Sequence, residues 1–131
     1  MNNHAVSDFI IRVKNASLAR RTEVTLPYSN INGEVARVLK EEGYLTEVKE
    51  TRDGNKKNLR VVIAYEKRRP VLTDVVIISK PSLRVYKPRK NIKDIEIRGR
   101  HTVVMTTSQG VMTGDKARKK GIGGEILFKI W

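Results

Sequence analysis

Cysteine is absent from this 131-residue sequence, histidine occurs only twice, and aromatic residues make up only 5% of the chain. Without cysteine there can be no disulfide, no thiol nucleophile and no cysteine metal site. The two histidines, His4 and His101, lie far apart in sequence, so they do not form a pair at metal-ligand spacing. We therefore expect a protein with no metal and no cofactor.

Long apolar runs are also lacking. None approaches the roughly 20 residues that a membrane-spanning helix needs. Near the beginning of the chain, Asp8, Arg12 and Lys14 interrupt the apolar residues before the core of a signal peptide could form. We expect a soluble cytoplasmic protein that has no membrane partner, in the reducing compartment that a cysteine-free chain suits.

Acidic residues are scarce: there are 14 of them against 27 lysines and arginines, which gives a formal net charge of +13. Residues 1–70 hold 14 basic and 9 acidic side chains, net +5, whereas residues 71–131 hold 13 and 5, net +8. Such an excess predicts a polyanionic partner, and the second half should contribute more of the attraction.

The first half of the chain predicts the element order α-β-α-β-β. Apolar residues recur at helical spacing in two segments, with Ser7 or Asp8 available to cap the first helix and Ser29 or Asn30 to cap the second. An Asp-Gly pair then signals a tight hairpin. The expected elements are a helix within residues 5–21, an extended piece over 22–29, a helix from 31 to a glycine stop at 43, and strands over 44–50 and 59–66.

The second half predicts mainly strands and one short helix. Thr113 can cap this helix, Asp115 lies in its first turn, and Gly121 ends it. Two prolines and many cations make residues 80–93 too broken for another helix. The expected strands lie in residues 71–80, 94–107 and 123–131.

A charged stretch closed by a proline, "KRRP", is the best candidate for a boundary between two lobes. The fold class expected is α/β in the α+β sense, with two small lobes. They are an N-terminal α/β lobe over residues 1–66, a linker over 67–70, and a mainly antiparallel β lobe with one short helix and the RNA-binding surface over 71–131.

The basic stretch from Lys80 to Arg100 contains eight lysines or arginines and two acids, with Tyr86 among them. Cations of this kind neutralise phosphates, and an aromatic side chain can stack on a splayed base. The alternative is a solvated surface segment. We favour binding, because nearby acids do not balance the charge.

Two motifs near the end of the chain allow more than one interpretation. The turn "TTSQG" offers hydroxyls that can read base edges and ribose hydroxyls, or that simply satisfy their own backbone. The cluster "GIGGE" lacks the ending and the context of a phosphate-binding loop, so close packing is preferred to nucleotide binding. His101 is interpreted as a solvated strand-end histidine, and Trp131 as an apolar anchor or a stacking group.

The stretch "TTSQGVMTGDKARKKGIGGEILFKIW" closely resembles the C-terminal signature of the eighth small-subunit ribosomal protein family. The segments "SDFIIRVKNA", "EEGYL" and "SKPSLRVY" are similar to family segments in the same order, so the resemblance spans nearly the whole chain. This sequence departs from the family pattern at Thr106, at Gln109 where lysine is usual, at His101 and at residues 114–116.

The resemblance implies a non-catalytic protein that binds a central-domain helix of small-subunit ribosomal RNA and supports subunit assembly. It also points to neighbouring ribosomal proteins and the protein's own messenger RNA as partners, and to a location in the ribosome. We expect a monomer when free, because the excess charge disfavours self-association. We add Arg118 as a candidate phosphate contact. The residues that the resemblance places at the RNA are Lys80, Pro81, Arg84, Tyr86, Thr106, Thr107, Ser108, Gly123, Gly124 and Glu125.

Two rival functions remain at this stage. A basic DNA-binding protein fits the charge, but the sequence has no recognisable recognition helix or dimer zipper. A small nucleotide-using enzyme fits only the glycines, and no acid–base partner is evident near Thr107 or Ser108.

Overall fold

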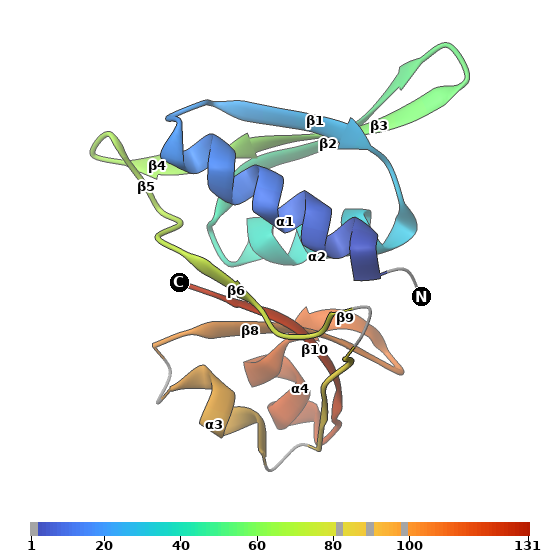
Figure 1. The fold of residues 1–131 in the computed structure, drawn as a ribbon, viewed down its shortest axis with the longest axis vertical. Coiled ribbons are helices and arrows are strands. Elements are labelled where there is room, and N and C mark those ends of the chain that lie inside the picture. Colours follow the sequence, from blue (N-terminus) through green and yellow to red (C-terminus); the bar gives the residue numbers. More distant parts are fainter. Residues whose placement is uncertain (1–2, 81–82, 89–90, 98–99) are drawn as a thin grey trace.

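The computed structural model describes residues 3–80, 83–88, 91–97 and 100–131. Figure 1 shows four layers: a first sheet, the two helices α1 and α2, a second sheet, and the helices α3 and α4. The first lobe is made of α1 (Asn3–Leu18), β1 (Glu23–Pro27), α2 (Asn30–Glu41), β2 (Leu45–Asp53) and β3 (Lys56–Ile63). Its antiparallel sheet has the strand order β1-β3-β2.

The apolar face of α1 is fully buried, which explains why this segment is a helix. Val6, Phe9, Ile10 and Val13 recur at helical spacing and all lie in the core. The prediction that Ser7 or Asp8 caps the helix is wrong, because α1 already begins at Asn3.

The predicted cap of the second helix, its glycine stop and the Asp-Gly turn are confirmed, whereas the strand expected over 59–66 ends at Ile63. Ser29 caps α2, since its hydroxyl accepts a hydrogen bond from the Asn32 amide at 3.2 Å. Gly43, just after the helix, has a φ of 88°, and Gly54 takes a φ of 64° in the turn between β2 and β3. Both φ values lie in the left-handed region that favours glycine.

Residues 67–70, predicted to be a linker, lie in a small hairpin. Its strands are β4 (Tyr65–Glu66) and β5 (Arg69–Pro70), in which Tyr65 pairs with Pro70 and Glu66 with Arg69. Lys67 and Arg68 form the tip, both with positive φ.

The second lobe is built around a sheet whose order is β6-β10-β8-β9, with β7 also paired to β10. Thr113 and Gly121 bound its longer helix, as the sequence predicts. The elements are β6 (Val75–Ile77), β7 (Tyr86–Lys87), α3 (Ile92–Glu96), β8 (Thr102–Thr107), β9 (Gly110–Thr113), α4 (Gly114–Lys120) and β10 (Gly124–Ile130).

Two expected strands are shorter than predicted. Of residues 71–80 only Val75–Ile77 form a strand, and the beginning of the segment 94–107 belongs to helix α3. The prediction of a single helix in the second half is therefore wrong, and α3 begins at Ile92, inside the segment 80–93 that was expected to hold no helix. Ile92 and Ile95 lie three residues apart, so a helical turn directs both toward the second core cluster, beside Val103 and Met105. Packing therefore overrides the alternation of Ile95 and Ile97, and Ile97 ends the helix with a left-handed φ of 47°.

One hydrophobic core runs through both lobes. It joins Phe9 and Leu39 of the first lobe to Val104, Val111 and Phe128 of the second. A salt bridge from Lys14 Nζ to Asp74 Oδ1, 2.6 Å long, crosses the same boundary. The sheet of the second lobe is thus covered on one face by α1 and α2 and on the other by α3 and α4 (Figure 1).

Candidate nucleic-acid interface

Three of the segments predicted to contact RNA meet in one row across the second sheet. Glu125 on β10 pairs with Thr106 on β8 along one edge and with Tyr86 on β7 along the other. Residues directly opposite each other in antiparallel strands project to the same face of a sheet. The fold thus brings together residues from positions 86, 106 and 125, which sequence spacing alone could not do.

The members of this row differ in exposure. The Tyr86 side chain is 63% exposed, Thr106 is half-buried, and Glu125 is only 4% exposed. The Tyr86 ring is therefore available for stacking, whereas the Glu125 side chain is buried. Gly123, just before β10, is half-buried.

Gly124 lets β8 and β10 approach closely. A Cβ atom at this position would lie 2.2 Å from the Thr106 carbonyl oxygen and 3.2 Å from the Thr107 Cα atom. No real side chain tolerates such contacts. The preference for close packing over nucleotide binding is thus explained by contacts within the protein.

In the hydroxyl-rich turn between β8 and β9, the hydroxyl groups differ in their contacts. The Thr107 hydroxyl accepts a hydrogen bond from the Gln109 amide at 3.1 Å and donates one to the Gly110 carbonyl oxygen at 2.9 Å. Gly110 takes a φ of 105°. Ser108, at the tip, is exposed. Thr107 thus stabilises the turn, and the Ser108 side chain is open to solvent at its tip.

The segment leading into Tyr86 is held by Ser79, a residue that the sequence analysis did not single out. Ser79 is buried, and its hydroxyl accepts a hydrogen bond from the Val85 amide at 2.8 Å. Lys80 and Leu83 exchange two backbone hydrogen bonds, at 2.9 and 3.0 Å, across the bend. In the sequence, the only sign of this role is the hydroxyl of Ser79, the first of the two serines in the motif "SKPSLRVY".

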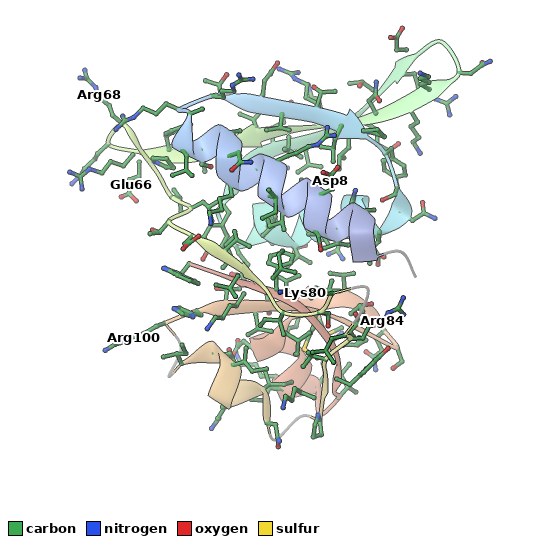
Figure 2. The ribbon with its side chains drawn as sticks, viewed as in Figure 1. Asp8, Glu66, Arg68, Lys80, Arg84 and Arg100 are labelled. Carbon is green, nitrogen blue, oxygen red and sulfur yellow. The ribbon has the colours of Figure 1, made fainter. Side chains whose placement is uncertain are left out.

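The cations of the same segment project outward. Lys80 and Arg84 are exposed, and Figure 2 shows both near the strands β6 and β7 of the second lobe. Pro81, also predicted to contact RNA, lies outside the described residues.

Arg118 is engaged by two carboxylates of its own lobe. Its Nε atom donates to Glu96 Oε1 at 3.2 Å, and its Nη2 atom donates to Asp115 Oδ1 at 2.8 Å. The Glu96 side chain is only 9% exposed. The Glu96 contact joins α3 to α4, so Arg118 has a structural role in the fold, and its contact with a phosphate stays a prediction.

A cation lies close to Gln109, the position at which the resembled family usually has lysine. Lys120 at the end of α4 places its Nζ atom 3.5 Å from Gln109 Oε1. The exposed Lys120 side chain thus supplies positive charge beside the hydroxyl turn from a different element.

His101 stacks on Trp131, away from the row. Their ring centroids are 4.0 Å apart, and the ring planes differ by 9°. Burial lowers the pKa of His101, and the positive charges of Lys129 and Arg100 lower this pKa further. Trp131 is also tied by its backbone to Asp74, with its amide 3.2 Å from the Asp74 carbonyl oxygen. The stacked pair thus anchors the end of β10.

The residues brought together can hold a polyanion. Exposed cations attract phosphates, the Tyr86 ring offers a stacking surface, and the Ser108 hydroxyl can donate and accept hydrogen bonds. Among the residues placed by the structure, no three His, Asp or Glu side chains are grouped so as to hold a metal ion. In the same part of the chain, no helix has the length and apolarity needed to cross a membrane.

Comparison with known proteins gives a consistent result along the whole chain. The family model described as ribosomal protein S8 matches residues 4–131. The chain is 38% identical to the small ribosomal subunit protein uS8 of a Nitratiruptor species, and the alignment covers 100% of both chains. It is 41% identical to the protein of the same name from Acidobacterium capsulatum, over 96% of each, and 36% identical to that of Nostoc punctiforme, over 98% of each.

Proposed function

Because the chain belongs to the ribosomal protein S8 family, we propose that its second lobe binds a helix in the central domain of small-subunit ribosomal RNA and helps that RNA to fold. Membership makes the protein a structural constituent of the small ribosomal subunit that binds ribosomal RNA, and not an enzyme. The expected location in the ribosome is thereby confirmed, and the rival functions in DNA binding and nucleotide chemistry are set aside.

The observation that carries the proposal is the row formed by Tyr86, Glu125 and Thr106. It joins two segments that the family resemblance assigns to RNA, one on β7 and one on β8, through the central strand β10. The exposed turn at Ser108 and the exposed Lys80 and Arg84 flank this row in the sequence. An interface of this kind suits an irregular RNA helix, in which unstacked bases and ribose hydroxyls are accessible.

Each group in the interface contributes a different term to binding. Lys80 and Lys120 attract phosphates over a distance and release counterions on contact. Tyr86 stacks on an unpaired base, a contact worth about 1–3 kcal/mol. Ser108 makes hydrogen bonds whose partners differ between RNAs, so its contribution favours the cognate site. Charge thus supplies affinity, and the aromatic and hydroxyl groups supply selectivity.

Chemical footprinting of the full chain on intact small-subunit RNA tests the proposal. We expect protection concentrated in one helix of the central domain, and we expect Tyr86→Ala to weaken that protection at unchanged protein stability. Duplex DNA at matched salt is the control for unspecific attraction. Equal affinity for the DNA, or protection spread evenly over the RNA, would refute the proposed site.

Two finer parts of the proposal concern partners. We propose that the free protein is a monomer, because its net charge of +13 opposes self-association. Sedimentation of the purified chain checks this.

We also propose that the protein binds its own messenger RNA through the same row. A messenger segment that competes with the ribosomal helix for the protein would support this, and simultaneous binding of both RNAs would contradict it.

A further inference from the structure

A second group of cations lies on the first lobe. Two hydrogen bonds hold its two segments side by side: Arg20 Nη1 donates to the Arg68 carbonyl oxygen at 3.1 Å, and the Tyr65 hydroxyl donates to the Arg21 carbonyl oxygen at 2.5 Å. The first segment follows α1, and the second is the β4–β5 hairpin. We call the five exposed cations of these segments the hairpin patch: Arg20, Arg21, Lys67, Arg68 and Arg69.

The hairpin patch has little compensating negative charge. Its hairpin contains one acid, Glu66, so five positive charges stand against one negative charge. Glu23, on the neighbouring strand β1, is already paired with Arg60. None of the five cations forms an ion pair with another residue placed by the structure. The patch can therefore accept an external polyanion without breaking an ion pair among the described residues.

The backbone conformation of the hairpin patch is a second, independent indication that its side chains have a function. Arg20, Lys67 and Arg68 have φ values of 56°, 50° and 68°. Glycine or asparagine takes this left-handed conformation with less strain than a residue with a long side chain. The chain nevertheless carries a cation at all three positions. Strained backbone of this kind clusters at functional sites.

The hairpin patch is separate from the interface of the second lobe. In Figure 2, Arg68 points away from the body of the first lobe at the left of the view, whereas Arg84 lies at the right of the second lobe and Lys80 near the middle. In Figure 1 the β4–β5 hairpin lies at the left of the first lobe, whereas the turn between β8 and β9 lies at the right of the second lobe. The two surfaces are thus placed to engage different parts of a folded polyanion.

We propose that the hairpin patch binds the phosphate backbone of a second RNA segment, so that the protein holds two segments of one folded RNA. Four of the five side chains are arginines, whose planar guanidinium groups match pairs of phosphate oxygens. The patch sits on loops and reads no base edge, so it contributes affinity that does not depend on sequence. The inference needs only RNA as the partner, and it is independent of which helix the second lobe binds.

The test compares two full-length variants that each lose two positive charges. Lys67→Asn with Arg68→Asn removes the tip of the hairpin patch. Arg12→Gln with Arg37→Gln removes cations that already pair with Asp8 at 3.3 Å and Glu41 at 3.0 Å. Asparagine suits the left-handed backbone, so the first variant should melt at the same temperature as the parent chain or higher. Affinity is measured against salt on complete small-subunit RNA and on the isolated central-domain helix.

On the complete RNA, we expect the hairpin variant to lower the magnitude of the log–log salt slope by about 1–2, and the paired-cation variant to leave it near the parent value. On the isolated helix, the two variants should bind alike. An unchanged slope on the complete RNA would overturn the proposal, as would an equal loss on both RNAs. Intact RNA binding with loss of a contact to an acidic ribosomal protein would also overturn it. If the parent chain does not bind the isolated helix more tightly than duplex DNA at matched salt, that result contradicts the interface of the second lobe and not the hairpin patch.

Discussion

Gly124 and Thr106 lie closer together than any side chain at residue 124 would allow, with 2.2 Å between an added Cβ atom and the Thr106 carbonyl oxygen. The contact is between two backbones, so no rotamer change can relieve it. It keeps β8 and β10 in the register that places Thr106 opposite Glu125. The glycine is therefore required by the packing of the protein, before any RNA is considered.

We expect Gly124→Ala to lower the free energy of unfolding by about 1–3 kcal/mol, because β8 and β10 must separate to admit the methyl group. Urea denaturation measures the change. Gly33→Ala is the matched control: its Cβ would meet the movable ring of Tyr28 at 3.1 Å, and alanine favours a helix. Equal stability of Gly124→Ala and the parent chain would show that the close approach relaxes freely.

Ser108 and Thr107 should give opposite signatures. Ser108 is exposed at the tip of the turn, so Ser108→Ala should preserve the melting temperature and weaken binding of the cognate RNA by about 1–3 kcal/mol at an unchanged salt slope. Thr107→Val removes hydrogen bonds to Gln109 and Gly110, so it should lower stability by about 1 kcal/mol and affect all RNAs alike. If Ser108→Ala leaves selectivity intact, the Ser108 hydroxyl does not read the RNA.

Arg118→Ala should act on stability and not on RNA binding. It removes the partner of the nearly buried Glu96, which we expect to lower the free energy of unfolding by about 1–3 kcal/mol. Lys119→Ala is the control, because Lys119 is 75% exposed and its ion pair with Asp115 should contribute about 0–1 kcal/mol. A fall of about 1 in the RNA salt slope for Arg118→Ala would instead identify a phosphate contact.

The stacked pair of His101 and Trp131 should make stability depend on pH. The pKa of His101 is lowered by burial, so the unfolded chain binds the proton more readily than the folded chain. The contribution of neutral His101 is therefore complete above its ordinary pKa of about 6.5 and declines as the pH falls below that value. Melting temperatures at pH 7 and pH 5 should differ less for His101→Phe, which keeps an aromatic ring against Trp131. An equal difference in both proteins would contradict this assignment.

Short, local signals were enough to predict much of the fold. Thr113 and Gly121 bound α4, and Ser29 caps α2, because capping depends on a few neighbouring residues. The segment around Ile92 and Ile95 misled the prediction, because four or five residues are too few to separate a helical period from an alternating one. The packing of this segment against Val103 in the second core cluster makes it a helix.

The candidate interface could be predicted as a set of segments but not as a surface. Pairing of Tyr86 with Glu125 depends on β7 joining β10 across almost forty positions of sequence, and no local pattern encodes that register. The role of Ser79 was missed for the same reason, since its partner Val85 becomes its neighbour only after the bend forms. The ion pair of Arg118 with Glu96 was missed as well, because the two residues become neighbours only in the folded chain.

The position of β10 has a consequence for the order of events during synthesis. Although β10 is made after the strands that it joins, it lies between β6 and β8 in the second sheet and supplies Phe128 to the core shared with the first lobe. A nascent chain without residues 124–130 lacks the partner of three other strands and leaves Phe9 and Leu39 incompletely covered. We therefore expect the second sheet and the shared core to complete their packing only after β10 has emerged from the ribosome that makes it. Folding would then be coupled to the synthesis of these residues, and we expect an unfinished copy to bind the RNA more weakly than a finished one.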